Sequence, residues 1–312
     1  MKAIILEKAG SVENLVIKEI KEPTIQENEV LIEVKALSIN PADVKIRATP
    51  EFVSAIYGDE DVILGWDISG IVKSVGSKVT KFKQGDKVFG MVNFPGRGNA
   101  YAQFVASPEN HLTKIPENMS FEQAAATTLA ALTALQALEN NIKKDDRILI
   151  HAGSGGVGHF AIQIAKHLGA YVITTSSAKN KDFVMSLGAD EHIDYRSQAF
   201  EEVVKDIDFV LDPMGGDTLE KSVKVMKENG TIICLPQDKF SDELINEAKK
   251  KNVNIINILV QSSSKDMDTL AQLITDKKLK PAISKTFTFE NMQDAHLEVE
   301  KGRSVGKVIV TL

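Results

Sequence analysis

The sequence contains little cysteine and no long apolar run. Cys234 is the single cysteine among 312 residues, so no disulfide can form within the chain and no cysteine cluster can bind zinc. No window reaches the ~18 consecutive apolar residues of a membrane-spanning helix. The first residues, MKAIILEKAG, include a short apolar run without the cleavage site of a secretory signal. We therefore expect a cytoplasmic protein with no membrane partner.

The sequence also lacks a large excess or a cluster of charges of one sign. The chain has 37 Lys and Arg against 43 Asp and Glu, a formal net charge of −6, and no block of basic residues. A surface for nucleic acid or anionic lipid usually needs clustered basic side chains, so we expect no nucleic-acid partner. The hydrophobic content of 43% and the charged content of 26% are typical of a globular protein. The length is sufficient for two domains of ~100–200 residues each.

A glycine-rich turn lies between two segments of regular pattern. The short apolar run at 147–150 has strand length, and apolar residues from Phe160 to Leu168 recur at helical spacing. Between them, glycines follow the spacing G-x-G-x-x-G, which allows a tight turn, a close approach of the backbone to a pyrophosphate and close packing of helix on strand. Free N–H groups at the helix start would bind the phosphates. The alternative is a loop that merely turns the chain. The predicted cofactor contacts here are Gly153, Ser154, Gly155, Gly156 and Val157.

The pattern of the chain divides it into three parts. Residues 1–117 contain short strand patterns separated by Gly, Pro, Asn and Asp turns, which predicts a compact antiparallel β-barrel. Residues 118–262 begin with an alanine-rich helix at about 124–140 and continue as alternating strands and helices. This alternation predicts an α/β domain, a doubly wound parallel sheet of six strands that binds a dinucleotide. Residues 263–312 end in a β–α–β pattern that we expect to return to the barrel. Leu235 and Pro236, at the end of one predicted strand, complete the set expected to contact the dinucleotide.

No acidic residue stands at the end of the second predicted strand. In sites for NAD, an Asp or Glu ~20 residues after the first glycine binds the ribose 2′-hydroxyl. Here residues 173–181 are ITTSSAKNK, with hydroxyls followed by Lys179 and Lys181. A carboxylate would repel a 2′-phosphate, whereas hydroxyls and an ammonium group would bind it. The sequence therefore favours NADP(H) over NAD(H), the alternative being that the two lysines form a solvated helix start.

Several motifs resemble the medium-chain dehydrogenase/reductase superfamily and, within it, the zinc-independent quinone oxidoreductases. The most specific motif runs from Gly65 to Val88, with the pattern G-x-D-x-x-G-x-V-x-x-V-G-x-x-V-x-x-F-x-x-G-D-x-V. Shorter matches are NPAD at 40–43, YAQFV at 101–105, LTA at 132–134 and GKV at 306–308. The resemblance spans essentially the whole chain. It implies a GroES-like β-barrel domain and a Rossmann domain with the active site between them, and a homodimer, which is common in the family.

The chain departs from the zinc-containing members of that superfamily. Those proteins have a cysteine in the segment that matches 40–43 and a histidine where this chain has Trp66, and they carry a four-cysteine lobe that is absent here. A catalytic zinc ion needs three protein ligands, and no such set is visible. The six histidines are scattered along the chain: His111, His151, His159, His167, His192 and His296. We predict a protein without a metal site.

The resemblance implies hydride transfer from the nicotinamide to a quinone or to the β-carbon of an α,β-unsaturated carbonyl. Asn40 is the candidate donor to the substrate oxygen or the nicotinamide ribose, and it could instead be a turn residue before Pro41. Tyr57 and Tyr101 are candidate pocket hydroxyls whose default role is packing. Thr133 would contact the nicotinamide, or be an ordinary buried helix residue. The proton could come from water, and no general acid can be named.

The segment after the second strand is closest to the NADPH-dependent enone and alkenal reductases. There, the resemblance implies that Ser176 or Ser177, together with Lys179 and Tyr195, holds the 2′-phosphate. Tyr195 could equally be a half-buried aromatic residue at a strand end. Two other functions remain open: an enoyl-thioester reductase on the same fold, and a non-catalytic NADPH-binding protein.

Overall fold

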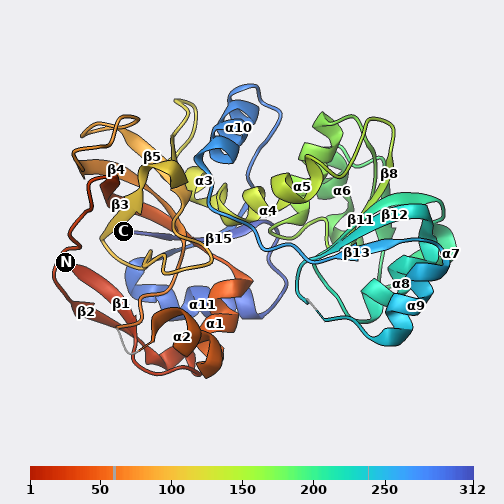
Figure 1. The fold of residues 1–312 in the computed structure, drawn as a ribbon, viewed down its shortest axis with the longest axis horizontal. Helices are drawn as coiled ribbons and strands as arrows, with labels where there is room; N and C mark the ends of the chain where they lie inside the picture. The colour runs from red at the N-terminus through yellow and green to blue at the C-terminus, as the bar shows by residue number, and fades with distance from the viewer. Residues whose placement is uncertain (59–60, 238) are drawn as a thin grey trace. The chain divides into compact units, whose positions relative to one another are not determined.

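The structure is a computed structural model that describes residues 1–58, 61–237 and 239–312 (Figure 1). Its contacts divide the chain into two compact units. The first unit comprises Met1–Leu132 and Val260–Leu312, and the second comprises Thr133–Leu259. The first unit is therefore built from both ends of the chain, and the second from one continuous segment.

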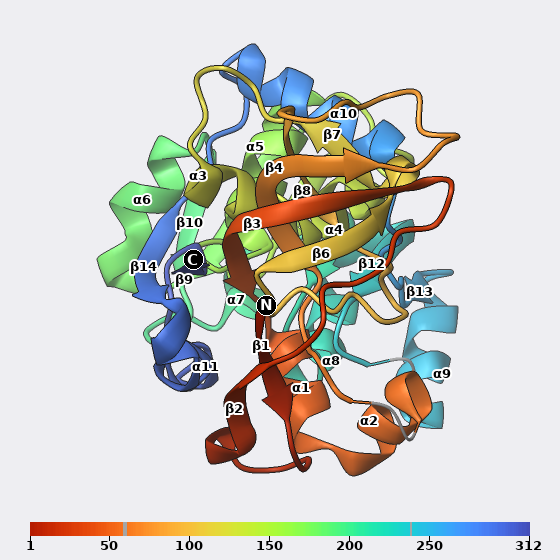
Figure 2. The same cartoon turned by 90° about the vertical axis from the view of Figure 1, so that its left-hand side faces the viewer.

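The first unit contains a sheet of seven strands, most of them antiparallel. Its order is β14-β15-β3-β4-β5-β7, and β6 also pairs with β3. The long strand β3 pairs with three neighbours, and the C-terminal strand β15 is one of them, with Val308 opposite Ile39. Figure 2 shows β3, β4 and β6 facing the viewer. The strands of this sheet are β3 (Glu29–Ile39), β4 (Asp67–Val75), β5 (Lys87–Met91), β6 (Phe104–Pro108), β7 (Leu112–Lys114), β14 (Ile283–Thr288) and β15 (Lys307–Thr311).

Further elements complete this unit. Strands β1 (Lys2–Leu6) and β2 (Leu15–Glu19) form a separate antiparallel pair. The α-helices are α1 (Pro41–Ala48), α2 (Pro50–Tyr57), α3 (Phe121–Ala126), α10 (Ser264–Thr275) and α11 (Met292–Glu300), and the short 3-10 turns are η1 (Val12–Asn14), η2 (Glu109–His111) and η4 (Phe289–Asn291). Among the described residues, no helix combines the length and the apolar character that crossing a bilayer requires.

The alanine-rich segment forms two helices, not the single helix that its composition predicts. Helix α3 ends at Ala126, and α4 (Leu129–Leu138) begins three residues later. Between them the hydroxyls of Thr127 and Thr128 donate to the carbonyls of Gln123 and Ala125, each at 2.8 Å. Asp67 Oδ1, from β4, accepts the backbone N–H of Leu129 at 3.0 Å. The break therefore has a local cause in the threonines and a long-range cause in Asp67.

Helix α3 determines where the first unit ends. Its residues Ala125 and Ala126 are buried against Ala36 of β3 and Ile309 of β15. Because this apolar contact lies on the barrel sheet, residues 118–132 fall in the first unit, whereas the sequence pattern groups them with the segment that follows. The small alanine side chains allow the helix to approach the sheet closely.

The second unit contains a parallel sheet of six strands in the order β10-β9-β8-β11-β12-β13. These strands are β8 (Arg147–Ile150), β9 (Tyr171–Ser176), β10 (Glu191–Asp194), β11 (Ile207–Asp212), β12 (Met226–Cys234) and β13 (Asn254–Ile256). The helical elements are α5 (Gly158–His167), η3 (Ala178–Asn180), α6 (Lys181–Ser186), α7 (Phe200–Val203), α8 (Asp217–Val225) and α9 (Asp242–Lys250). The predicted fold class, a β-barrel domain with a doubly wound six-stranded sheet, is confirmed.

Candidate cofactor and substrate sites

The glycine-rich turn joins β8 to α5 in the second unit. Gly153 lies against β9, because a Cβ there would collide with the Thr174 hydroxyl. Gly158 lies against its own turn, where a Cβ would collide with the Ala152 carbonyl and come 2.7 Å from the Gly153 Cα. A Cβ on Gly155 would meet just the Ala152 carbonyl, at 3.1 Å. Two of the glycines are thus required for packing, and the third has free space beside its Cα, although its N–H donates to the Ala152 carbonyl at 2.8 Å within the turn.

Side chains on both sides hold this turn in place. His151 is buried, with Nδ1 3.1 Å from the Thr175 hydroxyl and Nε2 3.0 Å from the Ser222 hydroxyl. Burial lowers the pKa of His151 to about 3, so the ring is neutral. Asn180 Nδ2 donates to the Ser154 hydroxyl at 2.9 Å, which joins the turn to the segment after β9. His151 is therefore a structural support, as its default role predicts.

Four of the predicted phosphate-binding residues lie together at the carboxyl edge of β9 and β10. The Tyr195 N–H donates to the Ser176 carbonyl at 3.3 Å, and Ser177 directly follows as the cap of η3. Tyr195 is 56% exposed. Lys179 is exposed, and within the described part of the chain it has no hydrogen-bond or ion-pair partner. An unpaired ammonium group beside hydroxyls is suited to an anion.

The other predicted contacts of the cofactor lie on β12 and α4. Leu235 directly follows β12, and its N–H donates to the Asp212 carbonyl at 2.9 Å. Its carbonyl accepts from Asn257 Nδ2 at 3.1 Å, and Pro236 comes next in the chain. Thr133 lies inside α4 and is buried.

In the first unit, Asn40 is the centre of a buried polar network. Its Nδ2 donates to Asp67 Oδ2 at 2.8 Å, and its Oδ1 accepts from the Lys307 ammonium. Its backbone N–H donates to Asp43 Oδ2 at 2.6 Å at the start of α1. Ser38 also donates to Asp67 Oδ2, at 2.6 Å. The network joins the start of α1 to β3, β4 and β15.

Sequence analysis did not single out Asp67 and Lys307 as functional residues. Both lie within motifs that carry the family resemblance, GWDISG and GKV, and this membership was the one signal available. Each is at most 3% exposed. Ionised side chains are almost never fully buried unless they are paired, so two such residues in signature positions indicate a shared structural role.

Tyr57 and Tyr101 are completely buried in the first unit, and their hydroxyls bond within it. The Tyr57 hydroxyl donates to the Ile63 carbonyl at 2.9 Å. The Tyr101 hydroxyl lies 3.0 Å from His296 Nε2. Burial raises the pKa of both phenols, and the Asp43 carboxylate raises it further. Both phenols are therefore neutral, and both hydroxyls bond within the unit; their role as pocket hydroxyls stays a prediction.

Trp66 occupies the position at which zinc-containing relatives were expected to have a histidine. Its ring is buried, its Nε1–H donates to the Gly96 carbonyl at 2.7 Å, and Phe94 packs edge-on against it at 5.2 Å. The indole has no lone pair to offer a metal. Among the described residues, no three His, Cys, Asp or Glu side chains gather in the manner of metal ligands.

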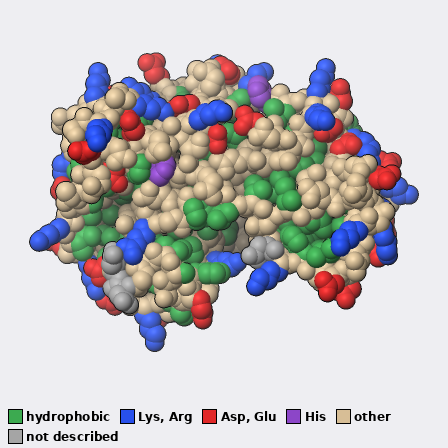
Figure 3. Space-filling model, in the orientation of Figure 1, with side chains coloured by type: hydrophobic (Ala, Val, Ile, Leu, Met, Phe, Trp, Pro, Cys, Tyr) green, Lys and Arg blue, Asp and Glu red, His purple; other side chains and the backbone are tan. Residues whose placement is uncertain are grey.

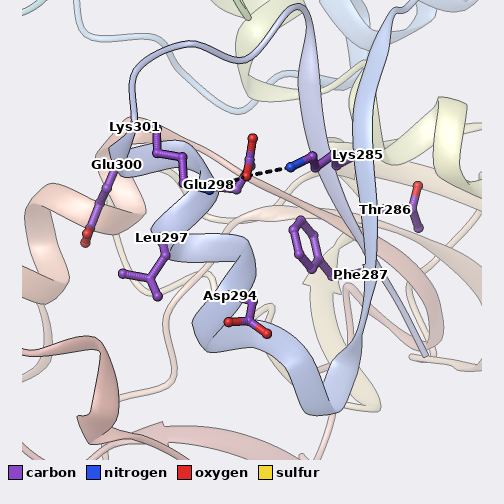
Figure 4. Close-up of a pocket in the computed structure, with 8 residues that line it drawn as sticks. All are labelled: Lys285, Thr286, Phe287, Asp294, Leu297, Glu298, Glu300 and Lys301. Carbon is purple, nitrogen blue, oxygen red and sulfur yellow. Dashed lines mark hydrogen bonds and ion pairs between the residues drawn. The ribbon is translucent and has the colours of Figure 1, made fainter.

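A surface pocket of the first unit lies between β14 and α11 (Figure 4). Lys285 points towards Glu298 across it, at 2.9 Å, and Lys301 also pairs with Glu298 at 2.9 Å. No predicted site residue lines this pocket, and its two lysines are paired with Glu298. On the face shown in Figure 3, acidic and basic side chains are interspersed.

Comparison with known proteins agrees with this geometry. The model of the alcohol dehydrogenase GroES-like domain matches residues 26–117, and that of a zinc-binding dehydrogenase matches residues 187–310. The 2-methylene-furan-3-one reductase of Solanum lycopersicum is 33% identical, over 99% of this chain and 79% of its own length. The chloroplastic NADPH-dependent alkenal/one oxidoreductase of Arabidopsis thaliana is 32% identical, over 99% of this chain and 79% of its own length.

Among solved structures, the quinone oxidoreductase from Coxiella burnetii superposes with a TM-score of 0.93 and 36% identity, covering 100% of this chain and 99% of that one. The family predicted from the Gly65–Val88 motif is thereby confirmed. The chain belongs to the medium-chain dehydrogenase/reductase superfamily, in the group of quinone and alkenal/one oxidoreductases, and it is an oxidoreductase.

Proposed function

We propose that the protein transfers hydride from NADPH to quinones or to α,β-unsaturated carbonyl compounds. The observation that carries the proposal is the edge of β9. There, Ser177 and an unpaired Lys179 stand where an acidic residue would bind the 2′-hydroxyl of NAD. The names of the Arabidopsis and Coxiella relatives, an NADPH-dependent alkenal/one oxidoreductase and a quinone oxidoreductase, support the same chemistry.

NADPH, when bound, would supply the hydride. We infer that the turn from Gly153 to Val157 holds the pyrophosphate, because Gly155 leaves space beside its Cα just before the start of α5. Ser177, Lys179 and Tyr195 would hold the 2′-phosphate through hydroxyl and ammonium donors. Thr133 would contact the nicotinamide, and Leu235 and Pro236 are proposed to contact the dinucleotide as well.

For the substrate, we infer that Asn40 is the polar group nearest to the chemistry. Its amide nitrogen carries a second hydrogen for which the described residues offer no acceptor. Asp67 and Lys307 fix the amide orientation, so this hydrogen has a defined direction. Because the hydroxyls of Tyr57 and Tyr101 bond to other groups of the first unit, we assign both residues a supporting role there. Quinones and enones are already electron-poor, so positioning and one hydrogen bond can be sufficient.

We also propose that the reaction needs no zinc ion. The positions that match zinc ligands in relatives hold Asn40 and Trp66, and Trp66 is sealed against Phe94 and Gly96. The test is to dialyse the enzyme against a chelator and to measure NADPH oxidation with a panel of quinones and enals. Undiminished turnover is expected. Activity that is lost on dialysis and restored by zinc would contradict the zinc-free mechanism.

Two further expectations stay predictions, and one alternative function stays open. A homodimer is checked by light scattering coupled to size-exclusion chromatography, and a cytoplasmic location by microscopy of the tagged protein. An enoyl-thioester reductase would prefer acyl-CoA or acyl-carrier substrates over free enones, so the same panel with both kinds of acceptor distinguishes the two activities.

A further inference from the structure

A histidine lies behind the serines at the edge of β9. His192 is on β10, which runs parallel to β9 with His192 opposite Thr174 and Asp194 opposite Ser176. The ring reaches diagonally across the strand pair, so that Nε2 lies 2.9 Å from the Ser176 hydroxyl oxygen. Ser176 is 2% exposed and His192 is half-buried. The contact is therefore shielded from solvent on the serine side.

The direction of this hydrogen bond follows from the other contact of Ser176. Its hydroxyl donates to the Ser177 carbonyl at 3.2 Å. A hydroxyl has one hydrogen, so the tautomer that satisfies both contacts is the one in which Nε2 carries the proton and Ser176 accepts from it. Ser176 then has no hydrogen left for a phosphate, whose oxygens only accept. The Ser177 hydroxyl has no partner among the described residues and remains available.

Ser176 thus forms hydrogen bonds with two residues that are expected at the phosphate, Tyr195 and Ser177. Its carbonyl accepts the Tyr195 N–H at 3.3 Å, and its hydroxyl donates to the Ser177 carbonyl. A hydrogen bond from His192 fixes the rotamer in which the hydroxyl reaches the Ser177 carbonyl, whereas the bond from Tyr195 is to the backbone. Without it, the Ser176 hydroxyl is free to rotate away from Ser177.

We propose that His192 is a positioning residue for the 2′-phosphate of NADPH, acting through the Ser176 hydroxyl on Ser177. This inference rests on the proposed preference for NADPH. It selects Ser177, not Ser176, as the hydroxyl that faces the phosphate.

The charges around the ring are consistent with an anion site. Asp194, two residues beyond His192, accepts from the Arg196 N–H at 3.2 Å and from the Ser197 hydroxyl at 2.9 Å. The Ser197 hydroxyl and the Arg196 N–H hold the pKa of Asp194 below its usual value, so its charge is retained within its own turn. Lys179 has no such partner in the described chain and remains free to attract the phosphate.

The test compares the affinities of NADPH and NADH in variants of the full-length protein. H192L removes the donor, and the dissociation constant for NADPH is expected to rise roughly 3- to 10-fold, the range for one lost hydrogen bond. The constant for NADH is expected to stay within about two-fold, since NADH lacks the phosphate. H192Q places an amide donor near the position of Nε2 and is expected to restore NADPH affinity.

A double-mutant cycle shows whether His192 acts through Ser176. S176A should weaken NADPH binding by a similar factor, and S176A/H192L should be no weaker than the single variants. Additive losses, or equal losses for NADPH and NADH, would overturn the inference. If the wild-type protein binds NADPH no more tightly than NADH, the proposed cofactor fails and the inference fails with it. A wild-type preference that H192L leaves intact contradicts the role of His192 alone.

Discussion

The Lys307 ammonium lies 3.8 Å from the Asp67 carboxylate, and both groups are buried in the first unit. Asn40 lies between them, bonded to both. Burial lowers the pKa of Lys307, while Asp67 and Asp43 oppose that shift. The pair therefore connects β15, the last strand of the chain, with the first residue of β4. It also orients Asn40, the residue that we place at the substrate.

Removal of the buried ammonium should destabilise the first unit strongly. Lys307→Met leaves Asp67 without its charged partner and removes a donor to Asn40. Breaking a buried pair in this way costs about 3–5 kcal/mol. Urea unfolding followed by circular dichroism measures the change in the free energy of unfolding.

The matched control for that experiment is Lys285→Met on the neighbouring strand β14. Lys285 pairs with Glu298 at 2.9 Å, but its side chain is 54% exposed. Exposed pairs contribute about 0–1 kcal/mol, so this variant should unfold almost as the wild type does. If both variants had equally small effects, the Asp67–Lys307 pair would have no special importance.

The buried carboxyl of Asp43 should make stability depend on pH in a specific direction. Burial raises the pKa of Asp43 from 3.8 to about 7. The hydrogen bond from the Asn40 N–H lowers this pKa, the charge of Asp67 raises it, and Lys307 and Tyr101 lower it by smaller amounts. Between these values the folded protein keeps a proton that the unfolded chain has released. The contribution of Asp43 to stability is therefore greatest below pH 3.8 and is lost as the pH rises to about 7.

Asp43→Asn isolates this effect, because its amide oxygen can still accept the Asn40 N–H. The melting temperature of the variant minus that of the wild type should increase between about pH 5 and about pH 8. Burial lowers the pKa values of His151 and His296 to about 3, so these residues make stability increase with pH. Their effect is the same in the wild type and in the variant, and it cancels in the difference. A difference in melting temperature that does not change with pH would mean that Asp43 titrates normally.

The features that could be predicted from the sequence are those with local patterns. The glycine spacing from Gly153 to Gly158 and the strand–helix alternation after it depend on neighbouring residues, and the structure contains both. The Asn40 network could not be predicted in this way. Its bond to Lys307 joins residues 267 positions apart, and its bond to Asp67 joins residues 27 apart. The contact with Asp67 needs β3 to pair with β4, and the contact with Lys307 needs the C-terminal strand β15 to pair with β3.

Other features that local patterns could not predict have the same origin. The break between α3 and α4 needs Asp67 as a partner for Leu129, which no helical pattern contains. The burial of Tyr57 and Tyr101 depends on how α2 and the segment before β6 pack, and a lone tyrosine carries no signal of that. Lys179 could be predicted as a cofactor contact because that prediction depends only on its position in the sequence, three residues after the end of β9.

Two glycine substitutions should separate packing from cofactor binding. A methyl group on Gly158 would overlap the backbone of its own turn, so Gly158→Ala should lower stability by about 1–3 kcal/mol. Gly155→Ala meets just one carbonyl at 3.1 Å and should fold normally. It should nonetheless weaken NADPH binding by about tenfold, or about 1.4 kcal/mol, because the added carbon stands where the phosphate approaches. Thermal melting and fluorescence titration give the two readouts; unchanged NADPH affinity in the folded Gly155→Ala protein would place the pyrophosphate elsewhere.

Two exposed lysines after β9 provide a matched pair for the phosphate site. Lys179→Ala removes the proposed charge and should weaken NADPH binding by about tenfold, the scale of a charge-assisted hydrogen bond. NADH binding should not change. Lys181→Ala, two residues further into α6, should affect neither cofactor by more than about two-fold. Equal losses in both lysine variants would indicate a general electrostatic effect in place of a specific contact.

The most direct test of the proposed function is to measure kcat/KM for NADPH and for NADH with the same quinone and the same enal as acceptors. We predict turnover with at least one acceptor class and a kcat/KM for NADPH at least about tenfold above that for NADH, equivalent to about 1.4 kcal/mol in the transition state. Equal values for the two cofactors, a preference for NADH, or NADPH binding without oxidation in the presence of either acceptor would contradict the proposal.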